Sequence, residues 1–203
     1  MGQAMERARR LRRWLAVLAS LARLPPRVAR FQWRARRLAA QIGDDFSLLS
    51  ATRPAKLAVL LDEARGRRAV VELGTATAWT SVSLLLADPA RTVLTYDPVR
   101  RPEREQYLRL VSRAVWDRLT FVEAAGEQGP RGPETVELLY VDSSHNREGT
   151  LRELEAWKQV LPQGAVVVLD DFAHPDYPGV REAVEQLSLR GEEHEGLFVH
   201  RVG

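Results

Sequence analysis

The chain of 203 residues has no cysteine, which excludes a disulfide scaffold, a zinc knuckle, an iron–sulfur site and a thiol nucleophile. It also has no uncharged apolar run near the roughly 20 residues that a transmembrane helix needs. Internal repeats and low-complexity linkers are absent as well. With 45% hydrophobic and 28% charged residues, the composition is typical of one globular α/β domain with at most a small appendage.

The charged residues are unevenly distributed along the chain. Residues 1–42 contain eleven arginines and one acid, Glu6, which gives a balance of +10. Because the whole chain carries +3, the remaining residues carry −7. The sequence therefore predicts an acidic body over residues 44–203 and a basic N-terminal arm over residues 1–43.

Two amphipathic helices are predicted in the arm. Apolar side chains recur at steps of three and four from Leu11 to Leu21, before Pro25-Pro26 ends the run. The same steps return from Val28 to Ile42, and Gly43 is a suitable C-terminal stop. Arginines precede the apolar positions of the second helix by one residue and predict a basic edge, made of Arg27, Arg30, Arg34 and Arg37.

The favoured interpretation of the arm is a pair of lid or dimer helices whose apolar faces pack on protein, with the arginine stems pointing outward. A helix lying on a membrane surface and a contact for nucleic acid or an acidic partner stay open. A signal peptide is a further alternative, since Arg12-Arg13 precede the uncharged segment Trp14–Ala22.

From residue 50 onward, short runs of Val, Leu and Ile alternate with helical segments. This alternation is typical of a parallel sheet that helices cover on both faces. We therefore predict a doubly wound, mostly parallel α/β fold with an N-terminal helical arm. The predicted strands are 68–74, 92–97, 119–124, 137–142, 165–171 and 196–202, and the predicted helices are 55–64, 79–87, 102–116, 149–161 and 178–189.

Acidic residues stand at the ends of four predicted strands. In doubly wound sheets, ligands bind at the carboxyl ends of the strands. Carboxylates placed there cost free energy unless they are paired, hydrogen-bonded or metal-bound, so their coincidence on one edge favours a functional site. The acids are Glu72, Asp97, Asp142, Asp170 and Asp171, and His145 follows the third of them by three residues.

The loop after the first predicted strand discriminates between nucleotide cofactors. A dinucleotide fingerprint requires glycine at three positions that are here Gly74, Ala76 and Trp79, and tryptophan cannot replace the third glycine. No Gly-Lys-Ser/Thr sequence follows, which excludes a Walker loop. A small-residue turn remains, with Asp97 placed to accept hydrogen bonds from two ribose hydroxyls. The pattern indicates a nucleoside-like ligand without a demand for phosphate.

At these positions the sequence resembles the class I S-adenosylmethionine-dependent methyltransferases. ELGTATA (72–78) is similar to their first motif, with Ala76 and Ala78 where glycine is commoner. Residues 141–172 resemble the metal-dependent small-molecule O-methyltransferases, in the manner of catechol O-methyltransferase and more closely of the macrocin and mycinamicin type. The resemblance covers about residues 50–190 and implies a methyltransferase domain over 44–203, with the arm outside it.

The resemblance implies S-adenosylmethionine as cofactor and assigns its contacts. Glu72 and Gly74 would shape the methionine end and Asp97 would bind the ribose. Thr80 would hold the cofactor carboxylate, although a plain helix residue is an equal alternative. The full expected set is Glu72, Gly74, Ala76, Thr80, Asp97, Ala125, Gly126 and Asp142, with Ala125 and Gly126 bordering the adenine.

The resemblance also implies a magnesium ion held by Asp142, Asp170 and Asp171, with His145 as general base. The residue types agree with this, because three carboxylates without a thiol form a hard-oxygen site suited to Mg²⁺ or a similar ion. An imidazole is a suitable proton acceptor near neutral pH. His174 is the one other histidine close enough in sequence to the last two acids to serve as a base.

The expected reaction is metal-assisted O-methylation of a sugar, polyketide or phenolic hydroxyl. A nucleic-acid or protein methyltransferase docking through the arm is an alternative, although VDSSHN (141–146) lacks the Asn/Asp-Pro-Pro-aromatic sequence of the amino-methylating families. A non-catalytic cofactor-binding or membrane-associated protein is the third. We expect a cytoplasmic protein, with a peripheral membrane position as alternative, that dimerises through its N-terminal helices. The sixth strand of the family is either short, around 191–195, or missing.

Overall fold

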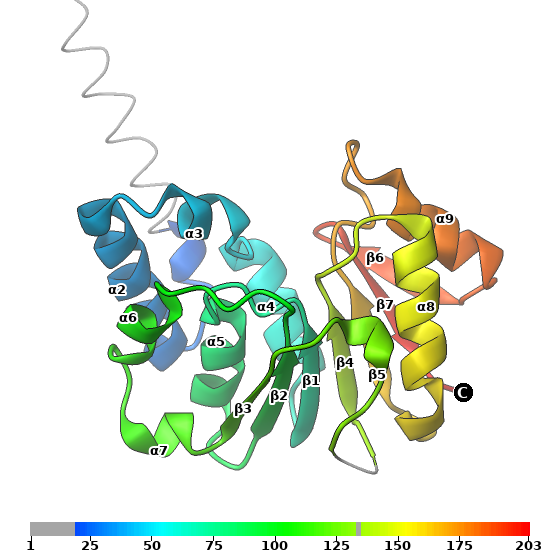
Figure 1. Cartoon of the computed structure of the whole chain (residues 1–203), viewed down its shortest axis with the longest axis horizontal. Coiled ribbons are helices and arrows are strands. Elements are labelled where there is room, and N and C mark those ends of the chain that lie inside the picture. Colours follow the sequence, from blue (N-terminus) through cyan, green and yellow to red (C-terminus); the bar gives the residue numbers. More distant parts are fainter. Residues whose placement is uncertain (1–18, 133–134) are drawn as a thin grey trace, which may run out of the picture.

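The computed structural model describes residues 19–132 and 135–203. They form three layers, in which a seven-stranded sheet lies between two groups of helices (Figure 1). The strand order is β3-β2-β1-β4-β5-β7-β6; β7 pairs antiparallel with β5 and β6, and the other neighbours are parallel. This confirms the predicted doubly wound, mostly parallel fold. The strands are β1 (Ala69–Leu73), β2 (Thr92–Tyr96), β3 (Leu119–Val122), β4 (Leu138–Val141), β5 (Val166–Leu169), β6 (Gly191–His194) and β7 (Leu197–Arg201).

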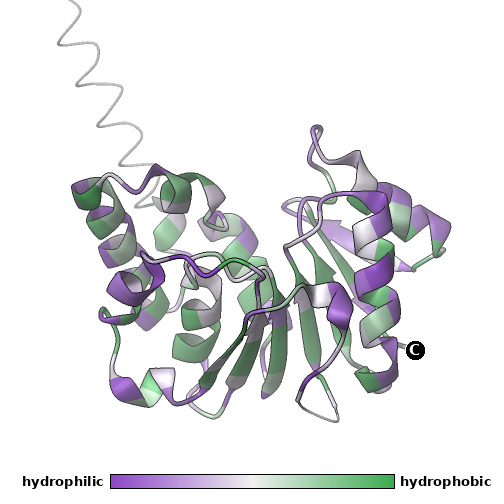
Figure 2. Cartoon of the chain, viewed as in Figure 1, coloured by the Kyte–Doolittle hydropathy of each residue, from purple (hydrophilic) through white to green (hydrophobic). Residues whose placement is uncertain are grey.

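Alternate residues of each central strand face opposite layers of helices. Val70, Leu138 and Val166 pack with α4 (Pro54–Glu63) and α5 (Trp79–Ala87), whereas Val71 and Leu139 pack with α8 (Arg147–Trp157) and α9 (Pro178–Gln186). Both faces of the central strands are buried, which explains why these strands are continuous apolar runs in the sequence. In Figure 2 the central strands are hydrophobic along most of their length, whereas β6 is hydrophilic and the outer helices α8 and α9 carry both kinds of residue.

Helix α2 (Pro26–Ile42) confirms the second predicted helix of the arm and is part of the core. Its apolar residues Val28, Phe31, Ala35 and Ala39 are buried, and α2 packs against α5. All four arginines of the predicted basic edge are exposed. The segment before residue 43, where the domain boundary was predicted, therefore packs directly on the α/β body through α5. Most of the apolar stripe of α2 packs within the chain, whereas Ile42 at its end is exposed.

The first predicted arm helix lies mostly outside the described residues, which begin at residue 19. Its end is described: Leu21 and Leu24 are buried in the core beside α4. Among the helices in the described ranges, none is long and apolar enough to cross a membrane.

Two helical segments differ from the sequence-based expectation, and the C-terminal hairpin confirms one of its two alternatives for the sixth strand. The prediction of one helix over 102–116 is wrong. This segment forms two helices, α6 (Arg104–Leu108) and α7 (Arg113–Trp116), because Ser112 is extended and precedes a new helix. A short helix, α3 (Asp45–Ser50), was not predicted. The sixth strand is present as the short β6, and Glu195 and Gly196, both with positive φ, turn the chain into β7.

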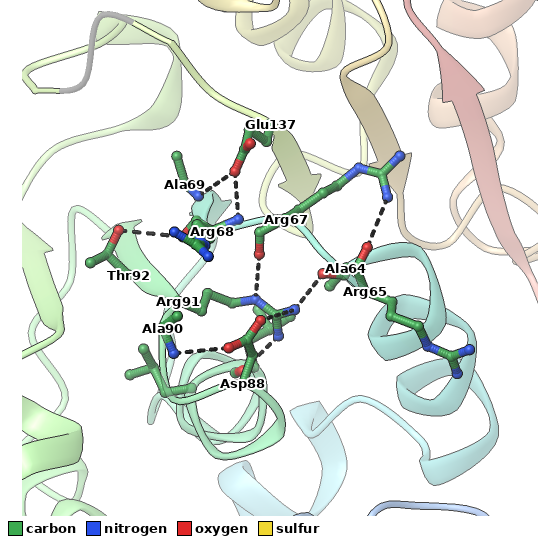
Figure 3. A network of polar contacts seen from close by, with 12 residues as sticks. Ala64, Arg65, Arg67, Arg68, Ala69, Asp88, Ala90, Arg91, Thr92 and Glu137 are labelled. Atoms are coloured by element: carbon green, nitrogen blue, oxygen red, sulfur yellow. Dashed lines mark hydrogen bonds and ion pairs between the residues drawn. The ribbon is translucent and has the colours of Figure 1, made fainter.

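The amino ends of the strands are closed by buried arginine. Arg91 is 1% exposed and donates hydrogen bonds to the carbonyl oxygens of Ala64, Arg67 and Leu84, which end or follow α4 and α5 (Figure 3). Arg118, which is half-buried, donates in the same way to Leu85 and to three further carbonyls nearby. These guanidinium groups satisfy carbonyls that helix ends leave without partners. The opposite edge of the sheet is left open for a ligand.

Candidate functional site

A cavity of about 600 Å³ lies at the carboxyl edge of the sheet. Residues following β1, β2, β3, β4 and β5 line it, together with α3, the start of α4 and Tyr177. The structure therefore brings together most of the sequence-predicted site. The predicted residues in the lining are Gly74, Ala76, Asp97, Ala125, Gly126, Asp142, His145, Asp170 and Asp171. Glu72 and Thr80 are not in the lining.

The loop after β1 is held in a conformation that needs small residues. Gly74 has φ +100°, and a Cβ built there would lie 1.9 Å from the backbone oxygen of Asp142. This glycine is therefore required by the close approach of the β1 and β4 ends. Ala76 and Ala78 also have positive φ, of 45° and 66°. At these two positions, where related motifs commonly have glycine, the alanines accept a left-handed conformation that costs about 1–2 kcal/mol each.

Glu72 points into the protein interior. Its side chain is 1% exposed and accepts hydrogen bonds from the hydroxyls of Ser81 on α5 and Thr95 on β2. Burial raises the pKa of Glu72 from about 4.5 to about 7, although the two hydroxyls and the charge of Arg104 pull it down. Glu72 thus connects β1 to β2 and α5 through its hydrogen bonds. Its side chain is not part of the cavity lining, where the prediction had placed it at the methionine end of the cofactor.

Thr80 and Asp97 differ in their access to the cavity. The hydroxyl of Thr80 lies 2.9 Å from that of Thr52, and Thr52 lines the cavity in its place. Asp97 does line the cavity; its Oδ2 accepts from the amide of Ala76 at 2.7 Å and its Oδ1 from the amide of Val99 at 2.8 Å. Each carboxylate oxygen has a second lone pair, so Asp97 can hold the loop and still accept hydrogen bonds from a diol.

Beyond Ala125 and Gly126, the cavity contains a buried acid that was not predicted. Glu153 on α8 is 3% exposed, and Ser143 donates to its Oε1 at 2.5 Å. Within the described residues its Oε2 is buried without a hydrogen-bond partner. Burial raises the pKa of Glu153 to about 7. Glu153 is therefore a cavity residue whose carboxyl is held mainly inside the protein.

The three acids predicted as metal ligands belong to a hydrogen-bonded chain. The hydroxyl of buried Tyr140 lies 2.6 Å from Asp170 Oδ2 and 3.1 Å from Asp142 Oδ2. On the other side, the ammonium of Lys56 donates to Asp170 Oδ1 and, at 2.8 Å, to Asp171 Oδ1. Lys56 comes from the first turn of α4 and is 9% exposed. A cation therefore lies between the last two acids.

The pKa values of Asp142 and Asp171, at the two ends of this hydrogen-bonded network, are shifted in opposite directions. Burial, followed by the charges of Asp170 and Asp171, raises the pKa of Asp142 well above its ordinary value, which favours the protonated form. Burial acts in the same direction on Asp171, but the hydrogen bond and charge of Lys56 outweigh it and leave the pKa of Asp171 lowered. The carboxylate nearest His145 is therefore the ionised one.

His145 lies at the outer end of the chain, with Nδ1 3.5 Å from Asp171 Oδ2. Its ring stacks on Tyr177 with the centroids 4.6 Å apart, and the ring of His174 stacks on the same tyrosine at 4.7 Å. The imidazole side chain is 31% exposed and lines the cavity. Asp171 and Tyr177 thus fix the ring position of His145, whereas His174 is a second imidazole on the same wall.

The mouth of the cavity is built by α3. Asp44 caps this helix, accepting from the amide and hydroxyl of Ser47 and from the hydroxyl of Tyr107. Ser47 in turn lies 2.9 Å from the hydroxyl of Thr77 in the loop after β1. The helix carries Phe46 and Leu49 into the cavity lining, and Leu49 is 86% exposed. An apolar, accessible surface therefore faces the polar wall of acids and histidines.

Sequence reasoning missed the residues of the site that lie outside the motifs. Lys56 carried one signal, since it is one of two lysines in a chain with 28 arginines. Thr52, Glu153 and Tyr177 carried none, because they enter the cavity from helices and loops whose orientation only the packing determines. Tyr140 lies within the fourth predicted strand, where an aromatic residue is expected for packing alone.

A family model described as a methyltransferase domain matches residues 71–172, half of the chain. The chain belongs to this methyltransferase family. The matched segment begins within β1 and ends just beyond Asp171, so it spans the strand ends that build the cavity. No curated protein matches the chain.

Solved structures of low sequence identity have the same fold as this methyltransferase. A putative caffeoyl-CoA O-methyltransferase from Staphylococcus aureus is 13% identical with a TM-score of 0.62, covering 86% of this chain and 99% of that one. The S-adenosylhomocysteine-bound methyltransferase PaMTH1 of Podospora anserina is 15% identical with a TM-score of 0.60, covering 89% of each chain. A TDP-rhamnose 3'-O-methyltransferase of calicheamicin biosynthesis is 16% identical with a TM-score of 0.56, covering 72% and 77%.

The cavity fits the predicted S-adenosylmethionine. Its volume lies within the range of about 300–1,000 Å³ usual for ligand sites. Asp97 lines the cavity and has lone pairs left for a diol.

The predicted magnesium ion does not fit the same arrangement. Asp170 and Asp171 hold the ammonium of Lys56, and Tyr140 bonds to Asp142 and Asp170. Within residues 19–132 and 135–203, no group of three or more acids and histidines is placed to hold a metal ion.

Proposed function

We propose that the protein transfers a methyl group from S-adenosylmethionine to a hydroxyl oxygen of a small molecule, with His145 as general base. The observation that carries the proposal is the juxtaposition, in one cavity, of the His145–Asp171 pair with Asp97 and the loop after β1. One part of the cavity suits a nucleoside and the other suits proton removal from an acceptor.

The cofactor is held by residues of the chain's first two strand ends and of α8. Asp97 accepts from the ribose hydroxyls, Gly74 and Ala76 leave room for the backbone to contact the ligand, and Ala125 and Gly126 border the base. Glu153 lines the same part of the cavity as Gly126 and borders the base with it. S-adenosylmethionine, when bound, supplies an electrophilic sulfonium methyl group.

The acceptor is oriented and deprotonated by the cavity residues around His145 and α3. The negative charge of Asp171, whose Oδ2 lies 3.5 Å from Nδ1 of His145, favours the proton on that nitrogen, which leaves Nε2 able to take the proton of the acceptor hydroxyl. Tyr177 stacks on the imidazole and holds its plane. Phe46 and Leu49 provide an apolar surface against a ring or chain of the acceptor. This combination suits a hydroxylated sugar, polyketide or phenol.

The proposal is tested by calorimetric titration of S-adenosylmethionine, followed by turnover of a panel of hydroxylated sugars, polyketides and phenols. His145→Ala should lower kcat by about 10²–10⁴, the usual contribution of a general base. His194→Ala is the matched control, since His194 is an exposed residue of β6 that pairs with Glu192 outside the cavity. Unchanged turnover in His145→Ala, or methylation of RNA, DNA or protein with no small acceptor, would refute the proposal.

A further inference from the structure

Lys56 occupies the place at which the family resemblance expects a divalent cation. Its ammonium bonds to both adjacent acids after β5, and its side chain is only 11% exposed. The same residue lines the cavity that contains His145. The residue thus has a position from which it can act on an acceptor, in addition to pairing with the acids.

Several of the carboxylate oxygens around Lys56 are already engaged in hydrogen bonds within the protein. Asp170 uses one oxygen for Lys56 and the other for the hydroxyl of Tyr140. Asp142 bonds to the same tyrosine at 3.1 Å. A divalent ion placed between Asp170 and Asp171 would have to displace the ammonium, because Lys56 already holds that position.

The identity of the residue is as informative as its position. The chain contains 28 arginines and only two lysines, so a general need for positive charge is met by arginine. At this position the cation is a compact ammonium, with three donors and the shape of a point charge, whereas a guanidinium is planar and wide. Two donors bond to Asp170 and Asp171, and within the described residues no other acceptor takes a hydrogen bond from Lys56. The third donor is therefore available to an oxygen in the cavity.

We propose that the ammonium of Lys56 replaces the divalent cation, so that methyl transfer in this protein is independent of metal; this rests on the proposed function. Lys56 donates a hydrogen bond to the acceptor oxygen and stabilises the negative charge that grows on it. His145 takes the hydroxyl proton, the oxygen–methyl bond forms, the sulfur–methyl bond breaks, and the electron pair stays on sulfur. Asp170 and Asp171 hold the ammonium in place.

Metal binding by the wild-type protein is measured first, by electron paramagnetic resonance during titration with Mn²⁺, a probe that reports without turnover. The expected result is no stoichiometric binding. Turnover of an acceptor should then be the same within twofold in Mg²⁺ and in excess EDTA. Stoichiometric Mn²⁺ binding together with a loss of turnover in EDTA of more than tenfold would overturn the proposal.

Variants of the two lysines give a second test. Lys56→Met keeps the length of the side chain without the charge, and should lower kcat at least 100-fold while the affinity for S-adenosylmethionine stays within threefold. It should also acquire Mn²⁺ binding, because Asp170 and Asp171 lose their cation. Lys158→Met is the matched control, since Lys158 is exposed and lies outside the cavity. A kcat of Lys56→Met within threefold of wild type would overturn the proposal.

The two proposals fail in different ways. If no hydroxylated acceptor is methylated, the proposed function fails, while the Mn²⁺ titration of the wild-type protein still decides whether Lys56 excludes a metal ion. If methylation occurs but needs a metal ion, the proposed function stands and the role assigned to Lys56 is wrong.

Discussion

Replacing Glu72 by glutamine tests whether a buried acid in the first methyltransferase motif makes the stability of this protein pH-dependent. The carboxyl is 1% exposed and bonds only to the hydroxyls of Ser81 and Thr95 among the described residues. Burial raises its pKa from about 4.5 to about 7. At 1.36 kcal/mol per tenfold change in proton affinity, this corresponds to about 3 kcal/mol.

The sign follows from which state binds the proton. Between about pH 4.5 and pH 7 the folded state keeps Glu72 protonated while the unfolded state releases the proton, so the free energy of unfolding falls as pH rises. Above pH 7 the folded state holds a buried carboxylate and the full loss is reached. The glutamine side chain of the variant does not titrate, so the stability of Glu72→Gln relative to wild type should rise by about 2–3 kcal/mol from pH 5 to pH 8.

Urea unfolding followed by tryptophan fluorescence at pH 5, 6.5 and 8 measures this difference. Glu185→Gln on the exposed face of α9 is the matched control and should give a difference that does not change with pH. The reasoning is refuted if the difference between Glu72→Gln and wild type is constant within about 0.5 kcal/mol, or if wild type gains stability relative to the variant as pH rises.

Three further predictions concern backbone space, the cofactor and the closed edge of the sheet. Gly74→Ala should prevent folding or lower the free energy of unfolding by more than about 3 kcal/mol, because the new Cβ meets the Asp142 carbonyl. The control Gly164→Ala is also at positive φ but in open space, and should lose only about 1–2 kcal/mol in urea unfolding. Equal losses in the two variants would contradict this reasoning. Asp97→Ala should weaken S-adenosylmethionine binding about 10–100-fold by calorimetry, and an unchanged Kd would exclude the ribose contact. Arg91→Met should lower the free energy of unfolding in urea by about 3 kcal/mol, because three buried carbonyl groups lose their hydrogen-bond donor. The exposed control Arg65→Met should lose less than about 0.5 kcal/mol. A loss below about 1 kcal/mol for Arg91→Met would contradict the role of these hydrogen bonds.

The predicted strands and most of the predicted helices are confirmed. Each of them is encoded by a short stretch of sequence whose apolar pattern is compatible with one type of element. Strands β4 and β5 are uninterrupted apolar runs, which only a sheet buried on both faces explains. The division of the helix predicted over 102–116 was not predictable in this way, since its residues are compatible with helix throughout. The first piece, α6, ends at Leu108, whose carbonyl accepts a hydrogen bond from the indole of Trp116.

Two predicted cofactor residues illustrate the limit of motif reasoning. Glu72 and Thr80 stand in the expected sequence positions, but their side chains turn toward Ser81, Thr95 and Thr52. The direction of a side chain at a strand end is set by the neighbouring strand and helix, and the sequence of the motif does not contain that information. The roles of the remaining site residues stay predictions.

The sequence by itself determined the order of strands and helices, the gathering of acids at one edge of the sheet, and the chemical class of the domain. The first two follow from apolar periodicity and from the rule that parallel strands end at one edge, and the class follows from the resemblance of residues 72–78 and 141–172 to methyltransferase motifs. Only the tertiary structure decided how those acids are used. It placed Lys56 from α4, more than a hundred residues away along the chain, between Asp170 and Asp171. A pairing at that separation depends on how a helix packs across a sheet, and no local pattern encodes it.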